Sequence, residues 1–391
     1  MQNNIIQLPG ERRKEALDLS MYAFQYKVKE EDIPEKLNHY AHQDIYGILK
    51  EDELVAKMHL LSHEVMIQGT RFKMGGVASV ATYPEHRRSG MVDALLKEAL
   101  LIMREKGQTL SYLHPFKISF YRKYGWEIFS SLKKVKLDRE DLKPLPSAPG
   151  RIVRYNKETH PPEANEVYEK FALQFGGMLT RTPYWWNYSV YHDYTLAMYY
   201  DHNGEAQAYM LYKAADKLIN VQEYVSLNFE GYRAMWNFIC QHDSMVEKAE
   251  IITSIHDPFP SYIDQPKVKT ELIPYFMARI VDVEGFLTQY TFNELEKKLV
   301  ISVTDEAAEW NNKIYMISNK EVTVLKADEW NDSDTRNEAI TLSINALTSV
   351  LLGAQTAETL AALGQITGQP DKLLAFQKAI PNIKPFFYDF F

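Results

Sequence analysis

The chain has 391 residues, a formal net charge of −8 and a single cysteine. Its length exceeds what one hydrophobic core usually supports, so we expect two or three domains. The acidic balance argues against a nucleic-acid partner, and a single thiol excludes an internal disulfide or a thiolate metal cluster. The sequence has no apolar run of membrane-spanning length and its first residues lack the pattern of a signal peptide, so we expect a cytoplasmic protein without a membrane partner.

Residues 1–150 alternate between helical and strand patterns. Apolar residues at i, i+3, i+4 and i+7 indicate helices, whereas short β-rich runs indicate strands. These patterns predict helices at 17–26, 89–106 and 118–124, and strands at 45–49, 53–62, 65–68, 71–81, 109–113 and 126–129. The segment is therefore expected to form a mixed α/β domain, and its proline-rich end at 144–150 is expected to be a linker.

Two further segments continue the mixed pattern. Residues 151–282 predict helices at 162–175 and 232–241 and strands at 195–200, 206–214 and 217–224. Residues 283–391 predict strands at 298–304, 313–318 and 321–326, then an Ala- and Leu-rich helical stretch at 340–363. We therefore predict an α/β (α+β) fold class with domains at 1–150, 151–282 and 283–391.

Charge is unevenly distributed, because residues 161–290 hold 17 acidic and 9 basic side chains and so account for the whole net charge. This acidic middle mildly favours a cationic ligand. A solvated acidic surface explains it at least as well.

The cysteine and the histidines give no indication of a metal site. Cys240 lies among apolar residues, which favours a packed, inert thiol. His59 and His63 fall in a predicted strand, where four residues span roughly 13 Å, too far to chelate one ion. His39 and His42 have no obvious third ligand, so we expect surface histidines and no bound metal.

A basic turn joins a predicted strand to a predicted helix within residues 77–96. The start of a helix offers unpaired N–H groups, Gly90 permits close backbone approach, and Arg87 or Arg88 can bind two phosphate oxygens. These features predict an anion site suited to a pyrophosphate. A basic helix start on the surface is the simpler alternative.

The chain ends in a cluster of aromatic residues, Phe386, Phe387, Tyr388, Phe390 and Phe391. Each ring can bury on the order of 150–250 Å², so the terminus is expected to dock inside the fold rather than fray. Docking would bring the α-carboxylate of Phe391 with it, where it could act as a catalytic group. The rings could equally serve only to fix the last segment to a core.

These motifs resemble known acetyltransferases. The basic turn, followed by Phe120-Tyr121 and a glycine at 125, resembles the GNAT acyltransferase superfamily, although Val92 replaces the expected small residue of its turn. His86-Arg87-Arg88-x-Gly90, the Arg181-Thr-Pro-Tyr-Trp-Trp186 segment and the phenylalanine terminus resemble the Eis (enhanced intracellular survival) family, over essentially the whole chain. The resemblance implies an N-terminal GNAT domain, a central GNAT-like domain without the cofactor turn, and a C-terminal sterol-carrier-like domain. It also implies a homo-oligomer, commonly a hexamer.

The resemblance implies acetyl-CoA as the acetyl donor and a set of residues that contact it. They are Val80, Ala81, Thr82, Arg87, Arg88, Ser89, Gly90, Met91, Val92, Asp93, Phe116 and Lys117.

Acetyl transfer to an amine needs a group that takes a proton from the ammonium and one that gives a proton to the departing thiolate. The resemblance implies that Tyr121, in the Phe-Tyr segment, is the general acid, and a buried tyrosine that only satisfies a backbone carbonyl is the alternative. Tyr124 is the competing candidate because it lies one helical turn away. The family implies that the Phe391 carboxylate is the general base. A free carboxylate is a weak base, and burial would raise its pKa.

Residues of the first helix region and the tryptophan pair could contact the acceptor, namely Phe24, Tyr26, Trp185 and Trp186, with Met21 and Tyr184 as neighbours. The alternative is core packing, which is the more common role of a tryptophan pair after a proline. The expected acceptor is an aminoglycoside, a polyamine or a lysine side chain. Transfer would be direct, in a ternary complex, because Cys240 is a poor nucleophile. The alternative is a lipid-binding or scaffold protein in which residues 340–363 line a lipid tunnel.

Overall fold

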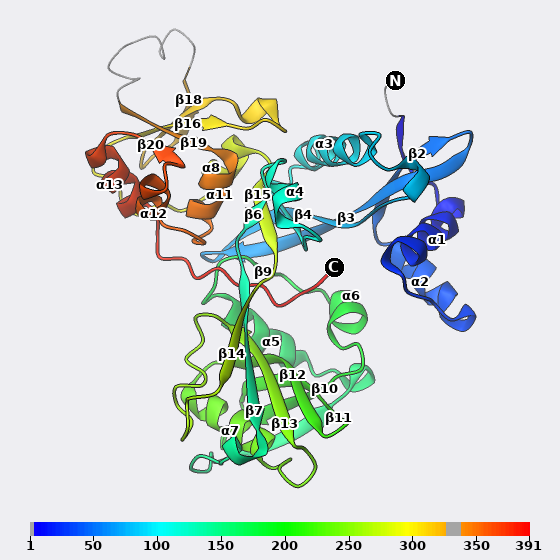
Figure 1. Ribbon diagram of the computed structural model, residues 1–391. Helices are drawn as coiled ribbons and strands as arrows, with labels where there is room; N and C mark the ends of the chain where they lie inside the picture. The colour runs from blue at the N-terminus through cyan, green and yellow to red at the C-terminus, as the bar shows by residue number, and fades with distance from the viewer. Residues whose placement is uncertain (1–3, 326–337) are drawn as a thin grey trace.

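The computed structural model describes residues 4–325 and 338–391, which form three mixed sheets covered by helices (Figure 1). This architecture confirms the predicted fold class. Within the described residues, no helix has both the length and the apolar character needed to cross a membrane.

The first sheet has the order β1-β2-β3-β4-β5-β15-β6, with β9 paired to β3. The expected strands at 53–62 and 65–68 form one continuous strand, and the β3–β4 turn has positive φ at Gln68 and Gly69. The strands are β1 (Ile5–Gln7), β2 (Asp44–Lys50), β3 (Glu53–Ile67), β4 (Thr70–Thr82), β5 (Leu110–Leu113), β6 (Glu127–Ile128), β9 (Met178–Leu179) and β15 (Met277–Ile280). The helices are α1 (Arg13–Phe24), α2 (Ile33–Tyr40), α3 (Met91–Glu105) and α4 (Ile118–Arg122).

The second sheet has the order β14-β7-β13-β12-β11-β10-β8. Its strands are β7 (Ser131–Asp138), β8 (Arg151–Tyr155), β10 (Thr195–Tyr200), β11 (Ala206–Ala215), β12 (Leu218–Ser226), β13 (Lys248–Ser254) and β14 (Lys269–Pro274). Its helices are α5 (Pro162–Ala172), α6 (Pro183–Trp185), which continues into one π-helical turn (Trp186–Val190), and α7 (Phe229–Cys240).

The two sheets exchange strands symmetrically. β15 comes from the second half of the chain and lies between β5 and β6 of the first, whereas β7 comes from the first half and lies between β13 and β14 of the second. Each sheet therefore depends on a strand that the other half supplies. The domain boundary at residue 150 stays a prediction, because the chain crosses between the sheets on both sides of it.

The third sheet has the order β18-β17-β16-β19-β20. Its strands are β16 (Leu299–Thr304), β17 (Ile314–Ile317), β18 (Val322–Val324), β19 (Ala339–Ser343) and β20 (Ile366–Thr367), with helices α8 (Val283–Gln289), α11 (Ile344–Leu351), α12 (Ala357–Ala362) and α13 (Pro370–Ala379). The end of the strand expected at 321–326 lies outside the described residues.

The helical prediction for 340–363 is wrong at its start. Ile340 and Leu342 are buried and alternate with Thr341 in β19, which pairs in parallel with β16, and the Ser343 side chain then caps α11. Strand pairing overrides the helical pattern of these apolar residues.

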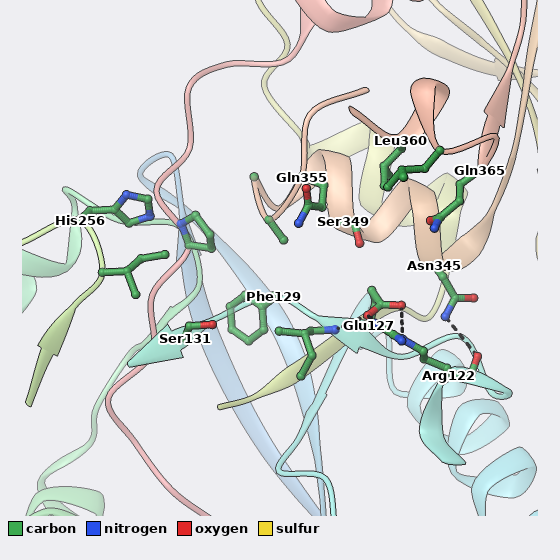
Figure 2. Close-up of a pocket in the computed structure, with 16 residues that line it drawn as sticks. Arg122, Glu127, Phe129, Ser131, His256, Asn345, Ser349, Gln355, Leu360 and Gln365 are labelled. Atoms are coloured by element: carbon green, nitrogen blue, oxygen red, sulfur yellow. Dashed lines mark hydrogen bonds and ion pairs between the residues drawn. The ribbon is translucent and has the colours of Figure 1, made fainter. Parts of the chain in front are cut away.

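The segment expected to line a lipid tunnel, 340–363, contains the end of β19 and the helices α11 and α12. α11 is buried almost throughout and packs into the core. A hollow of about 700 Å³ lies beside α11 and α12, and Figure 2 shows charged and amide side chains at its wall, including Arg122, Glu127, Asn345 and Gln355. The lipid-tunnel alternative therefore finds no support in this region.

Candidate active site

The basic turn lies between β4 and α3 and is exposed from Arg87 to Gly90. Gly90 has a φ of +77°, and a Cβ there would meet nothing within 4 Å. Among the described residues, no side chain caps α3. The first N–H groups of α3 therefore face open space next to two guanidinium groups.

A bulge in β4 shapes the strand that leads to this turn. The β3–β4 register shifts between Lys57 and His59, and Ser79 on the bulged strand has a φ of +51°. Val80 follows the bulge and lines a cavity, whereas Ala81 and Thr82 are buried and the Thr82 carbonyl accepts a hydrogen bond from Arg87 Nε at 3.4 Å.

The remaining residues expected to contact acetyl-CoA lie in the first turn of α3 and just before α4. Met91 has a buried side chain, so only its backbone is available, and Asp93 forms an ion pair with Lys97 at 3.0 Å. Phe116 is 74% exposed, and its ring lies 5.5 Å from the ring of Tyr121. The exposed Lys117 directly precedes α4 as its N-cap residue, and the partly buried Val92 lies in the first turn of α3.

A cavity of about 640 Å³ joins the bulge, the start of α4 and the end of the chain. Residues far apart in the sequence line it, including Phe24, Tyr26, Val80, Tyr121, Trp185 and Phe391. The structure thus brings most of the residues expected to act in catalysis or acceptor binding to one cavity.

Tyr121, and not Tyr124, lines this cavity. Tyr121 is 4% exposed, and burial raises the pKa of its phenol to about 12. Burial together with Asp93 raises the pKa of Tyr124 to a similar value, and both tyrosine rings pack against Phe120, but Tyr124 is not among the residues that line the cavity. Of the two tyrosines left open by the sequence, the geometry favours Tyr121.

The aromatic terminus runs between the two larger sheets, and Figure 1 shows this red segment ending beside β4 and α6. Phe386 and Phe387 are fully buried. The Phe391 ring lies on Gly76 of β4, where a Cβ would come within 2.7 Å of it. It also packs beside His63 and Trp185. The glycine in the strand therefore makes room for the last ring.

Asp389 fixes this segment through a buried cluster that we call the tail clamp, formed by Asp389, Arg181, Glu223, Tyr168 and Trp185. The Asp389 carboxylate accepts hydrogen bonds from Arg181 Nε at 2.9 Å, Trp185 Nε1 at 2.8 Å and the Tyr168 hydroxyl at 3.3 Å. Arg181 also pairs with Glu223 of β12. Burial disfavours the cation, but Asp389 and Glu223 outweigh it and raise the pKa of Arg181. Our sequence reasoning missed Asp389, although an acid inside an aromatic terminus was a visible signal.

Trp186 does not line the cavity. Its ring lies over the Arg181 guanidinium at 4.6 Å, and its indole N–H donates to Asn165 at 2.9 Å. Trp185 and Trp186 are consecutive on a helical turn and point to different sides, so only Trp185 reaches the cavity. Neither Met21 nor Tyr184 is among the lining residues.

His39 is buried rather than on the surface, which corrects our expectation, whereas His42 is exposed. His39 stacks on Tyr188 and takes part in a chain of hydrogen bonds. Its Nδ1 lies 2.8 Å from the Tyr184 hydroxyl, and Gln43 connects His39 with His59 at 2.6 Å on each side. Burial lowers the pKa of His39 to about 3, so the His39 side chain is neutral at pH 7.

Within the described ranges, no group of three or more His, Cys, Asp or Glu side chains is arranged to hold a metal ion.

Comparisons with known proteins agree with this geometry. Two acetyltransferase (GNAT) domain models match residues 4–129 and 177–280, and a sterol carrier protein domain model matches 283–388. The N-acetyltransferase Eis of Mycobacterium tuberculosis is 26% identical over 333 residues, 78% of each chain. An uncharacterized N-acetyltransferase of Streptomyces avermitilis is 21% identical over 371 residues, 88% of this chain and 87% of the relative.

Solved structures show the same three-part fold. A probable N-acyltransferase from Enterococcus faecalis superposes with a TM-score of 0.92 at 26% identity, covering 100% of this chain and 99% of the other. Eis1 from Mycobacterium abscessus superposes with a TM-score of 0.80 at 22% identity and covers all of both chains, which shows the shared fold. The chain therefore belongs to the GNAT acetyltransferases and has the Eis-like arrangement of two GNAT domains followed by a sterol-carrier-like domain.

Proposed function

We propose that the chain transfers an acetyl group from acetyl-CoA directly to an amine within a ternary complex. One observation carries the proposal: Tyr121 and Phe391 line the same cavity, and the β4 bulge connects that cavity with the open start of α3.

The donor would lie along the end of β4 and the start of α3. Its pyrophosphate would be held by Arg87, Arg88 and the N–H groups from Ser89 to Asp93, and its pantetheine arm by the backbone of Val80, Ala81 and Thr82. Phe116 and Lys117 would flank it. The empty space at Gly90 and the uncapped helix support this placement.

The chemistry requires one bond to form and one to break. The acceptor ammonium gives up one proton, and its nitrogen then attacks the thioester carbonyl. The C–S bond breaks, the nitrogen loses a second proton to give the amide, and the CoA thiolate takes up a proton to give the free thiol. The Phe391 carboxylate would attract the ammonium and accept its proton. A tyrosine hydroxyl is protonated at neutral pH, and burial raises the pKa of Tyr121 further, so Tyr121 can donate a hydrogen bond to sulfur as negative charge develops there.

The third domain would serve to deliver Phe391, since the chain leaves α13 and passes through the tail clamp before it reaches β4. The proposed acceptors are an aminoglycoside, a polyamine or a lysine side chain. A homo-oligomer, as the Eis resemblance implies, is part of the same proposal, and sedimentation velocity would test it.

The test is CoA-thiol release from acetyl-CoA with a panel of aminoglycosides, polyamines, lysine peptides and simple monoamines, combined with calorimetric titration of acetyl-CoA. We expect tight acetyl-CoA binding and release that depends on the acceptor. Absence of binding would contradict the donor site. Binding without release for any amine would contradict the transfer.

A further inference from the structure

The acceptor cavity contains no acidic side chain. All 17 acidic residues of segment 161–290 lie elsewhere, as do the other Asp and Glu residues that the structure describes. The negative charge expected at this cavity is therefore the Phe391 carboxylate alone. This contrasts with the polycationic acceptor that the overall charge distribution favoured.

Lys36 on α2 brings a positive charge to the same cavity. Its ammonium lies 5.9 Å from the centre of the Tyr188 ring, and the described residues give it no ion-pair partner. Burial lowers the pKa of Lys36, and Glu35 offsets this only in part. A half-buried ammonium group without a counter-ion is costly, and an anionic ligand group would remove that cost.

Other buried basic side chains of the chain show what normally surrounds such a group. Arg181 lies between Asp389 and Glu223, and Arg279 pairs with the buried Asp305. Lys57, fully buried behind the cavity wall, has three hydrogen-bond acceptors, namely His59 Nε2 at 2.8 Å and the Oγ and carbonyl oxygen of Ser79 at 2.6 and 3.1 Å. Lys36 differs from all three because the space in front of it is the cavity.

The rest of the wall is aromatic or neutral. The rings of Tyr26, Tyr188, Trp185 and Phe391 can hold one ammonium group by cation–π contact and can pack against an apolar body. His39 and His59 are neutral because burial lowers the pKa of each. A second ammonium group would meet Lys36 and find no carboxylate side chain among the lining residues.

We propose that the acceptor is a small zwitterionic monoamine, with its ammonium between the Phe391 carboxylate and the aromatic wall and its carboxylate or phosphate group paired with Lys36. This rests on the proposed acetyl transfer, and it replaces the polyamine and aminoglycoside acceptors proposed above with a different class of amine. α2 and α4 lie apart in Figure 1, on different sides of the chain's end, so the anionic group would be held away from Tyr121. Polyamines and aminoglycosides are then poor acceptors.

The experiment compares acceptors of one shape and different terminal charge: ε-aminocaproate, hexylamine and hexamethylenediamine, and in a second series para-(aminomethyl)benzoate, para-methylbenzylamine and para-xylylenediamine. We expect kcat/KM to fall in that order in each series. In Lys36→Met, the ratio of kcat/KM for the carboxylate acceptor to kcat/KM for the methyl acceptor should fall about tenfold, because one charge-assisted contact is lost. Lys36→Glu should reverse the order and favour the diamine.

Lys29→Met is the matched control, because Lys29 is exposed just before α2 and pairs with Glu31. It should leave the preference unchanged. A diamine preferred by the unmodified protein, or a carboxylate preference that survives Lys36→Met, overturns the zwitterion proposal while acetyl transfer stands. No CoA release with any amine overturns the transfer itself and the acceptor class with it.

Discussion

The two GNAT-like halves contain the same strand-turn-helix unit, but the start of the helix is open in the first half and capped in the second. Between β4 and α3, Gly90 faces open space and no side chain caps the helix. Between β12 and α7, Asn228 caps the helix by accepting a hydrogen bond from Gly231 N–H at 2.8 Å. A Cβ on Gly231 would come within 2.5 Å of Ser226 Oγ, so no ligand could approach there. Glu230 adds a negative charge to the first turn.

A helix start binds an anion only while its N–H groups are unoccupied and the nearby charge is positive. The first half meets both conditions and the second meets neither. The second half instead supplies most of the tail clamp and so holds the chain's end in place. Similar folds thus serve different purposes because a few side chains at the turn differ.

The largest expected effect is that of removing Tyr121, the proposed general acid. Tyr121→Phe removes the hydroxyl but keeps the ring, so kcat should fall about 10²–10⁴-fold with little change in acetyl-CoA affinity. Tyr124→Phe and Tyr262→Phe are matched controls, the second from the loop after β13 in the other half. Steady-state kinetics with the best amine would decide, and a kcat for Tyr121→Phe within twofold of the control variants would exclude Tyr121 as the acid.

One substitution in each of the two turns tests directly whether only the first turn binds acetyl-CoA. Arg88→Ala should weaken acetyl-CoA binding about tenfold or more, since a hydrogen bond to a charged group contributes about 1.5–3 kcal/mol. Asn228→Gly alters the corresponding turn of the second half. It should leave acetyl-CoA affinity unaltered and lower only the free energy of unfolding, by a few tenths of a kcal/mol. Calorimetric titration measures both. Equal losses of affinity would show that the second half also binds the donor.

The tail clamp gives a third prediction. Asp389→Asn keeps the shape but removes the charge opposite Arg181, so we expect roughly a tenfold lower kcat, because one charge-assisted contact is lost. Acetyl-CoA affinity should be unchanged, since the donor site lies at the turn. Hydrogen exchange should increase in residues 386–391. Asp243→Asn in the surface turn after α7 is the control, and unchanged exchange at the terminus would argue against the clamp.

The smallest effect concerns pH. Burial lowers the pKa of His63 to about 4 and that of His39 to about 3, whereas an unfolded histidine titrates near 6.5. Below pH 6.5 the unfolded state therefore binds protons that the folded state does not, and stability should fall as pH falls toward 4. Urea unfolding at pH 7 and pH 5 measures this loss. The loss of unfolding free energy between pH 7 and pH 5 should be smaller in His63→Gln. A loss identical to that of the unmodified protein would contradict the lowered pKa of His63.

The sequence was informative where function depends on local pattern and less so where it depends on pairing across the chain. The turn at Arg87 to Gly90 and the position of Tyr121 could be read directly, because strand, turn and helix are contiguous. The exchange of β7 and β15 could not, since nothing local marks which sheet a short strand joins. The tail clamp joins Arg181 to Asp389, and no periodicity relates residues so far apart. The burial of His39 and Trp186 also depends on neighbours from other elements.

The most direct test of the account is to extend the chain beyond Phe391. A short Gly-Ser tag at this end replaces the free carboxylate of Phe391 with a peptide bond, and the same tag at the other end is the control. We predict that the C-terminal tag abolishes acceptor-dependent CoA release while acetyl-CoA binding stays within twofold of the control. A C-terminally tagged protein that turns over at the control rate would contradict the role of the Phe391 carboxylate.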